Sequence, residues 1–105
     1  MKYSAEYYAD FQNKYPQVAQ EFGKLAQACH QAGPLDIKSR RLIKVGIAIG
    51  IGSEGDLQSH VIQALDEGVT PDEIRHAILQ SITTAGFPKM IVAMRWAEEI
   101  IGKKK

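Results

Sequence analysis

The residues with the clearest chemical potential lie in one stretch, from Ser53 to Pro88. This stretch contains His60, and histidine is the side chain whose ordinary pKa lets it donate or accept a proton near pH 7. Asp56 stands four positions earlier. On a helix that spacing puts the carboxylate on the same face, about one turn away, where it can hold or charge the imidazole. The pair therefore predicts an acid–base device.

Each of these residues also has a purely structural interpretation. Ser53 followed by Asp56 is typical of a helix start, where the hydroxyl caps a backbone N–H and the acid lies near the positive end of the helix dipole. His60 borders an apolar face that carries Leu57 and Val61. It can therefore equally be a histidine that is satisfied within the core. The spacing by itself leaves both interpretations open.

The remaining reactive residues give weaker signals. Cys29 is the single cysteine of the chain, which excludes an internal disulfide framework and fits a reducing compartment. It falls on an apolar helical face with Phe22 and Leu25, so we expect a core thiol. His30 stands beside it, but no Cys-x2-Cys, His-x3-His or acidic cluster supplies further metal ligands. We predict no metal and no cofactor.

Length and charge limit the classes of partner. The 105 residues favour one domain, and 13 Lys and Arg against 12 Asp and Glu give a net charge of +1. Such a balance offers no basic surface for nucleic acid or an anionic membrane. The longest apolar run, Val45 to Gly52, is far shorter than the ~18–20 residues that cross a bilayer. The first residues are aromatic and acidic and lack an apolar signal core, so we expect a cytoplasmic protein.

Helical periodicity runs through the whole chain, and no segment alternates like an amphipathic strand. Thr70, Pro71 and Glu73 form the clearest helix start, a capping box with proline in the first turn, and Gly68 is typical of a left-handed helix stop. Six helices are expected: from Ser4, from Pro16 to Gly33, from Asp36 to Ile51, from Ser53 to Glu67, from Thr70 to Ala85, and from Pro88 to near Gly102. We predict an all-α fold, a compact bundle of about six helices in one domain (1–105) that opens with an N-terminal helix pair (1–33).

The last of these helices carries more apolar surface than one small core needs. Apolar residues form one stripe and also spread around the other side: Met90, Ala93, Met94 and Ala97 on the first, and Ile91, Val92, Trp96, Ile100 and Ile101 on the second. Exposed apolar patches usually mark interfaces, so a homo-oligomer is expected.

Several spaced positions together resemble a known family. They are a basic, apolar helix from Leu35 to Gly52, then His60-x3-Ala64-x3-Gly68-Val69-Thr70-x2-Glu73-Ile74, then Ala85-Gly86-x-Pro88. This order looks like the carboxymuconolactone decarboxylase family, whose superfamily includes the alkylhydroperoxidase D-like proteins, and the resemblance places a family core at residues 35–102. It implies an all-helical fold, assembly into trimers or hexamers, and small sites between helices near the family's histidine.

The thiol-dependent branch of that superfamily uses a glutamate, a Cys-x-x-Cys pair and the histidine. The matching positions here are Arg41, Ser53, Asp56 and His60, so three of the four depart from the pattern. The missing cysteines are the groups that attack the peroxide and resolve the sulfenic acid, and serine and aspartate do neither. Peroxidase chemistry is therefore the most distant of the functions considered.

The decarboxylase branch has an acidic residue four positions before its histidine, which Asp56 and His60 resemble. Decarboxylation requires the substrate carboxylate to be held, the developing enolate to be stabilised and a proton to be delivered. Arg41, the Ser53 hydroxyl and His60 are the candidates for these roles in that order, although neither branch's pattern has arginine at position 41.

Two hypotheses follow from the resemblance. The first is an enzyme of the carboxy-lyase type that performs acid–base chemistry on a small anionic substrate. The second is a non-catalytic homo-oligomer that keeps the family fold. The sequence does not name a substrate, choose trimer or hexamer, or assign a role to Cys29.

Overall fold

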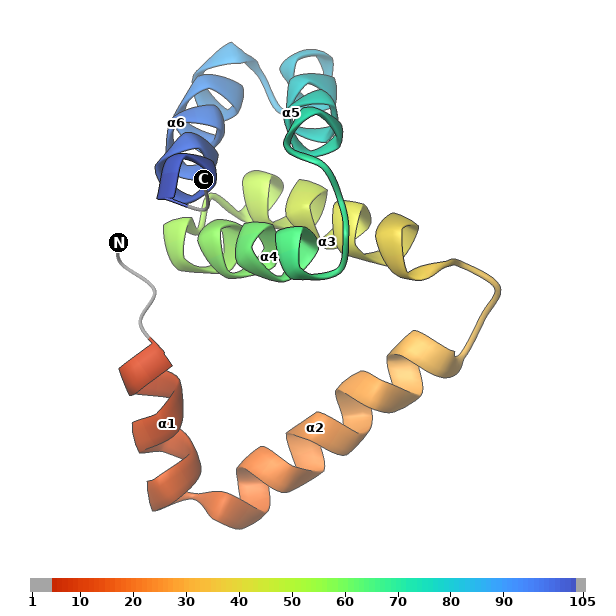
Figure 1. The fold of residues 1–105 in the computed structure, drawn as a ribbon, viewed down its shortest axis with the longest axis vertical. Coiled ribbons are helices and arrows are strands. Elements are labelled where there is room, and N and C mark those ends of the chain that lie inside the picture. Colours follow the sequence, from red (N-terminus) through yellow and green to blue (C-terminus); the bar gives the residue numbers. More distant parts are fainter. Residues whose placement is uncertain (1–4, 104–105) are drawn as a thin grey trace. The chain divides into compact units, whose positions relative to one another are not determined.

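Six α-helices and one short 3-10 helix account for almost all of residues 5–103, the part of the chain that the computed structural model describes (Figure 1). No strand occurs within that part, so the predicted all-α class is confirmed. The helices are α1 (Ala5–Lys14), α2 (Pro16–Gln31), α3 (Ile37–Ile51), α4 (Glu54–Asp66), α5 (Pro71–Leu79), η1 (Gln80–Thr83) and α6 (Phe87–Lys103). The predicted cap at Ser4 lies outside the described residues.

The chain divides into two units, close to the predicted end of the N-terminal helix pair. Helices α1 and α2 pack against each other in the first unit, with the rings of Phe11 and Tyr15 5.8 Å apart at their centroids. In the second unit α3 packs along α4, and α5 packs on α6, while α5 also contacts α3 and α6 contacts α4 (Figure 1). The four helices of the second unit therefore enclose a shared interior.

That interior is the hydrophobic core. It consists of fully or almost fully buried apolar residues from all four helices and the loop between α4 and α5: Val45, Ala48, Ile49, Leu57, Val61, Ala64, Val69, Ile74, Ile78, Met90, Ala93, Ala97, Ile100 and Ile101. Among the described residues of the first unit, by contrast, only Ala19 is buried. The stability of this chain therefore resides mainly in α3 to α6.

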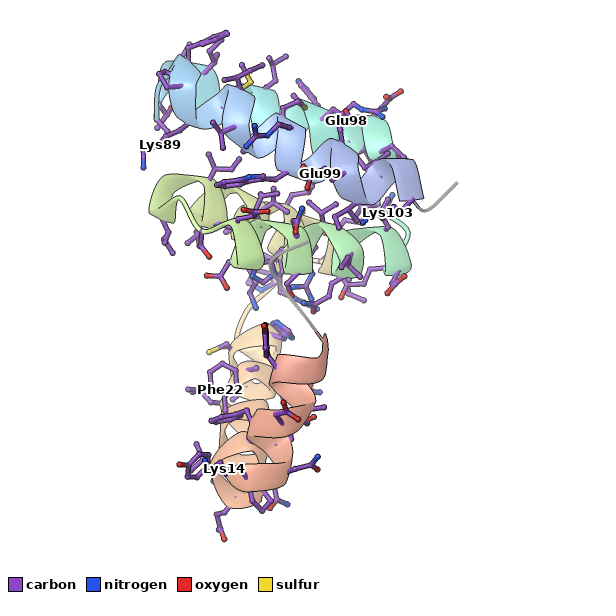
Figure 2. All side chains as sticks on the ribbon, turned by 90° about the vertical axis from the view of Figure 1, so that its left-hand side faces the viewer. Lys14, Phe22, Lys89, Glu98, Glu99 and Lys103 are labelled. Carbon is purple, nitrogen blue, oxygen red and sulfur yellow. The ribbon has the colours of Figure 1, made fainter. Side chains whose placement is uncertain are left out.

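The first unit exposes the apolar face that was expected to be buried. Phe22 and Leu25 are about three-fifths exposed, and Phe22 projects from α2 (Figure 2). Cys29 is a free and exposed thiol. The prediction of a core thiol is therefore wrong for the single chain, because helical periodicity reveals an apolar face but not whether another element covers it.

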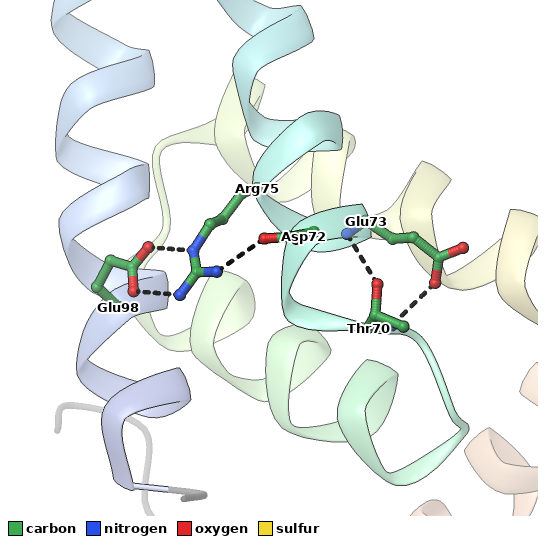
Figure 3. A network of polar contacts seen from close by, with 5 residues as sticks. All are labelled: Thr70, Asp72, Glu73, Arg75 and Glu98. Atoms are coloured by element: carbon green, nitrogen blue, oxygen red, sulfur yellow. Dashed lines mark hydrogen bonds and ion pairs between the residues drawn. The ribbon is translucent and has the colours of Figure 1, made fainter.

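Side chains at the helix ends follow the predicted capping chemistry. The Thr70 hydroxyl accepts a hydrogen bond from the Glu73 backbone N–H at 3.1 Å, and the Glu73 carboxylate accepts one from the Thr70 N–H at 2.9 Å, which confirms the capping box (Figure 3). This backbone donor is the main reason that the pKa of Glu73 lies below its ordinary value. Gly68, at φ +90°, ends α4 in the left-handed conformation that was expected.

The end of α5 differs from the prediction of one helix to Ala85. The α-helix stops at Leu79 and tightens into η1. The Ser81 hydroxyl donates to the Ile78 carbonyl at 2.7 Å, and the Ser81 carbonyl accepts the N–H groups of Thr84, Ala85 and Gly86. Local side-chain bonding and the convergence of three donors on one oxygen replace the regular α pattern there.

Polar links join α6 to its neighbours. Arg75 on α5 donates two hydrogen bonds to the Glu98 carboxylate, at 2.6 and 3.1 Å (Figure 3). Gln58 on α4 is fully buried and donates to the Trp96 carbonyl and to Glu99, whose side chain lies toward α4 (Figure 2). Within the described residues, no helix is long and apolar enough to cross a membrane.

Candidate functional site

The predicted site residues Arg41 and His60 lie together at the interface of α3 and α4. Arg41 is buried, with only 7% of its side chain exposed, and it makes three polar contacts. Its Nε and Nη2 atoms donate to the two carboxylate oxygens of Glu67, at 2.9 and 3.0 Å. Its Nη1 atom lies 2.8 Å from His60 Nδ1. A carboxylate, a guanidinium and an imidazole thus form a continuous chain, which we call the Glu67–Arg41–His60 relay.

The contact between Arg41 and His60 determines which ring nitrogen of the neutral imidazole carries the proton. A guanidinium only donates hydrogen bonds and stays charged in proteins, so His60 Nδ1 must be the acceptor. The ring proton of neutral His60 is therefore on Nε2. This assignment follows from donor chemistry, and it leaves Nε2–H as the polar group that His60 can offer to a ligand.

The surroundings of His60 favour its neutral form. Burial is the largest effect that lowers its pKa below the ordinary value, and the positive charges of Arg41 and Lys44 lower it further. The negative charges of Asp56 and Glu67 act in the opposite direction but are weaker. His60 is thus a neutral imidazole at pH 7 in this structure.

His60 also lines a small open pocket of about 80 Å³. The other residues around it are Lys44, Ile47, Ala48 and Ile51 of α3, and Asp56 of α4. One ammonium, one carboxylate and one imidazole therefore face the same apolar hollow. These groups suit a small anion that also carries a hydrogen-bonding group.

Asp56 and Ser53 occupy different positions relative to this pocket. Asp56 is exposed and lines the pocket together with His60, as their i, i+4 spacing predicted. Ser53 is the N-cap of α4, and its hydroxyl accepts the Asp56 backbone N–H at 3.1 Å. The structural interpretation of Ser53 is therefore confirmed, and the residue is not among those that line the pocket.

Two residues of the site were missed by the sequence reasoning. Glu67 lies seven positions after His60, two helical turns along the same face of α4, and that spacing was the available signal. Lys44 lies three positions after Arg41 on α3. Neither spacing indicates which charged side chain turns toward the histidine, because that depends on how α3 and α4 pack.

No group of three or more His, Cys, Asp or Glu side chains within the described residues has the geometry to hold a metal ion. His76 is exposed on α5. The charged and polar groups that the structure places at the pocket are those of His60, Lys44 and Asp56, and the relay reaches the pocket through His60.

Comparison with known proteins identifies the relatives of this chain. The family model described as the carboxymuconolactone decarboxylase family matches residues 16–99, which is most of the chain. The chain belongs to the carboxymuconolactone decarboxylase family. The resemblance predicted from the spaced positions is thereby confirmed, and the match includes every residue of the relay and of the pocket.

Two curated relatives are named as decarboxylases. The chain is 34% identical over 62 residues to the 4-carboxymuconolactone decarboxylase of Acinetobacter baylyi, covering 59% of this chain and 46% of that protein. It is 40% identical over 60 residues to the nitrosuccinic acid decarboxylase of Metarhizium robertsii, covering 57% and 42%. The chain thus spans less than half the length of these two enzymes.

Two further relatives match over most of their length. An uncharacterised protein of Methanocaldococcus jannaschii is 28% identical over 88 residues, which is 83% of this chain and 85% of that protein. The crystal structure of an apo carboxymuconolactone decarboxylase family protein from Legionella pneumophila superposes with a TM-score of 0.81 at 24% identity, covering 95% of this chain and 89% of that one. The latter likeness supports the family fold.

Proposed function

We propose that this chain catalyses the decarboxylation of a small carboxylate at the His60 pocket. The observation that carries the proposal is the contact of Arg41 with His60 Nδ1, which leaves Nε2–H as the donor of a neutral imidazole that lines a pocket together with Lys44. The two curated decarboxylases to which the chain is similar support this reaction class.

The substrates that fit the chemistry are β-keto acids and carboxylated lactones. In both, the bond to the carboxylate carbon can break because the electron pair is delocalised onto a neighbouring carbonyl oxygen. The Lys44 ammonium attracts the anionic substrate. The pocket of about 80 Å³ accommodates only the reacting end of such a molecule.

The reaction proceeds by electrostatic stabilisation. The carbon–carbon bond breaks, carbon dioxide leaves, and the electron pair forms an enolate whose oxygen accepts a hydrogen bond from His60 Nε2–H. Water then protonates the enolate carbon, so one proton is consumed per turnover. A donor held in place in a partly apolar hollow stabilises such an oxyanion far better than solvent does. Ile47 and Ile51 supply the apolar wall.

This mechanism changes the role first predicted for His60. An imidazolium that delivers protons would have to give up its contact with Arg41, because a protonated Nδ1 cannot accept a hydrogen bond. We assign His60 the role of a neutral hydrogen-bond donor. Its lowered pKa keeps the imidazole uncharged, as this role requires. Asp56 also lines the pocket.

A decarboxylation screen tests the proposal. β-Keto acids and lactone carboxylates are incubated with the wild type, His60→Ala and His76→Ala, and the carbon dioxide released is measured. We expect His60→Ala to lose about 10²- to 10³-fold in kcat, the usual effect of removing one oxyanion donor. His76→Ala is the matched control, because this exposed histidine lies outside the pocket, and it should retain wild-type rates.

Two outcomes would contradict the proposed decarboxylase mechanism. Equal rates in the wild type and His60→Ala would remove His60 from the mechanism. A folded wild type that turns over none of these substrates would favour the non-catalytic member of the family instead.

We further infer that the chain forms homo-oligomers through α3. Part of the apolar surface expected in excess on α6 is buried within the unit, since Ile100 and Ile101 belong to the core, while Ile91 is 47% exposed. A row of exposed isoleucines instead follows α3 at four-residue spacing: Ile43, Ile47 and Ile51, at 48%, 55% and 65% exposure. Such a row is a large apolar surface for a soluble monomer.

Light scattering at micromolar concentration tests this inference. We expect a mass of several chains for the wild type and a shift toward the monomer for Ile43→Glu, because a charge in an apolar interface stays unpaired. Ile43 is the residue to change because it does not line the His60 pocket, whereas Ile47 and Ile51 do. A monomeric wild type would refute the inference.

A further inference from the structure

We propose that Glu67 is a positioning residue of the His60 site, which acts through Arg41 to hold His60 as a hydrogen-bond donor toward the pocket. Glu67 itself is not among the residues that line the pocket. It is linked to the imidazole through the guanidinium, because it binds Arg41 on one side and His60 binds Arg41 on the other.

The first argument is geometric. Two parallel hydrogen bonds from Nε and Nη2 to one carboxylate fix both the position and the plane of the guanidinium. The third nitrogen, Nη1, then has a defined direction, and it lies 2.8 Å from His60 Nδ1. A single contact to Glu67 would leave the plane free to rotate, so the bidentate pair is what aims Nη1 at the ring.

The second argument is electrostatic. Arg41 carries a permanent charge with 7% of its side chain exposed, and such a charge remains buried only when it is paired. Glu67 supplies the countercharge and is itself 30% exposed. Without the carboxylate, the guanidinium is driven toward water, and His60 Nδ1 loses its donor.

The consequence for catalysis rests on the proposed function. If His60 Nε2–H stabilises the enolate, Glu67 contributes by fixing the orientation of that donor. A misplacement of about 1 Å costs on the order of 10²-fold in rate. Lys44 still attracts the substrate when Glu67 is absent. We therefore expect Glu67→Gln to lower kcat by about tenfold or more, with little change in KM.

A test without substrate separates this proposal from the decarboxylase hypothesis. The ¹⁵N chemical shifts of the imidazole nitrogens are followed by NMR as a function of pH in the wild type and in Glu67→Gln, with His60→Gln used to assign the signals of the three histidines. In the wild type we expect an unprotonated Nδ1, a protonated Nε2 and a pKa below the ordinary value of about 6.5.

The sign of the pKa change in Glu67→Gln is decisive. The charged groups that act on His60 are Arg41 and Lys44 on α3, Asp56 on α4 and Glu67 at the C-terminal cap of α4. If Glu67 acts only as a negative charge near His60, its removal lowers the pKa further. If Glu67 holds Arg41 in place, its removal frees the guanidinium, and the pKa of His60 rises toward the ordinary value while Nδ1 becomes partly protonated. We expect the rise.

Two further variants keep the test conclusive. Arg41→Met removes the hydrogen-bond donor together with the buried charge. It should therefore fold even if Glu67→Gln does not. It should also raise the pKa of His60. Glu98→Gln breaks the similar bidentate pair with Arg75, which lies away from His60, and should leave the His60 signals unchanged. An unchanged or lowered His60 pKa in Glu67→Gln, or no rise in Arg41→Met, would overturn the proposal even if decarboxylation is observed.

Discussion

Replacing Leu57 by alanine is expected to lower the free energy of unfolding by about 3 kcal/mol. Leu57 has no exposed surface and lies on α4 in the centre of the core that α3 to α6 share. Alanine removes three carbon atoms there and leaves a cavity that rigid helices on every side cannot fill. Urea denaturation followed by circular dichroism measures the change.

Leu79→Ala provides the matched control, because the same atoms are removed from a side chain that is 48% exposed at the end of α5. It should change the unfolding free energy by no more than about 0.5 kcal/mol. Equal losses in the two variants would mean that the core is not where the structure places it.

Replacing Glu67 by alanine is expected to lower the free energy of unfolding by about 2 kcal/mol. Removing one partner of a fully buried ion pair costs roughly 3–5 kcal/mol, because the remaining charge stays unpaired. The smaller figure reflects the 30% exposure of Glu67, through which solvent reaches the guanidinium of Arg41. Thermal and urea unfolding both measure the loss.

Two comparisons show whether the stranded charge is the cause. Glu98→Ala also removes a bidentate carboxylate, but its partner Arg75 is 38% exposed, so only a small fraction of the loss is expected. The double variant Arg41→Met with Glu67→Gln removes both charges and should recover most of the stability. A double variant as unstable as Glu67→Ala would assign the loss to packing instead.

The local features of the fold were predictable from short stretches of sequence. The capping box of Thr70 and Glu73, the stop at Gly68 and the cap at Ser53 each depend on residues within four positions of one another. Backbone hydrogen bonds at a helix end are completed locally, so the residue types reveal them. The spaced positions also predicted the family, because a set of residues at fixed spacing across several helices and turns is more specific than one short motif.

Predictions were less successful where they depended on whether another element packs against an apolar helix face. The periodicity of α2 correctly showed an apolar face with Phe22, Leu25 and Cys29, but the structure leaves that face exposed. Of the apolar residues expected in excess on α6, Ile100 and Ile101 belong to the core and Ile91 is exposed, while a row of exposed isoleucines lies on α3. Periodicity gives the direction in which a side chain points along its own helix, and it carries no information about what lies opposite.

The sequence by itself determined that this chain is an all-helical member of the carboxymuconolactone decarboxylase family without the cysteine pair, and that His60 and Asp56 share one helical face. Only the tertiary structure decided the state of the histidine. Arg41 lies 26 positions before Glu67 on a different helix, and the packing of α3 along α4 brings both to one imidazole. Hydrogen-bond partners between helices depend on that packing, and they determine which nitrogen of His60 carries the proton.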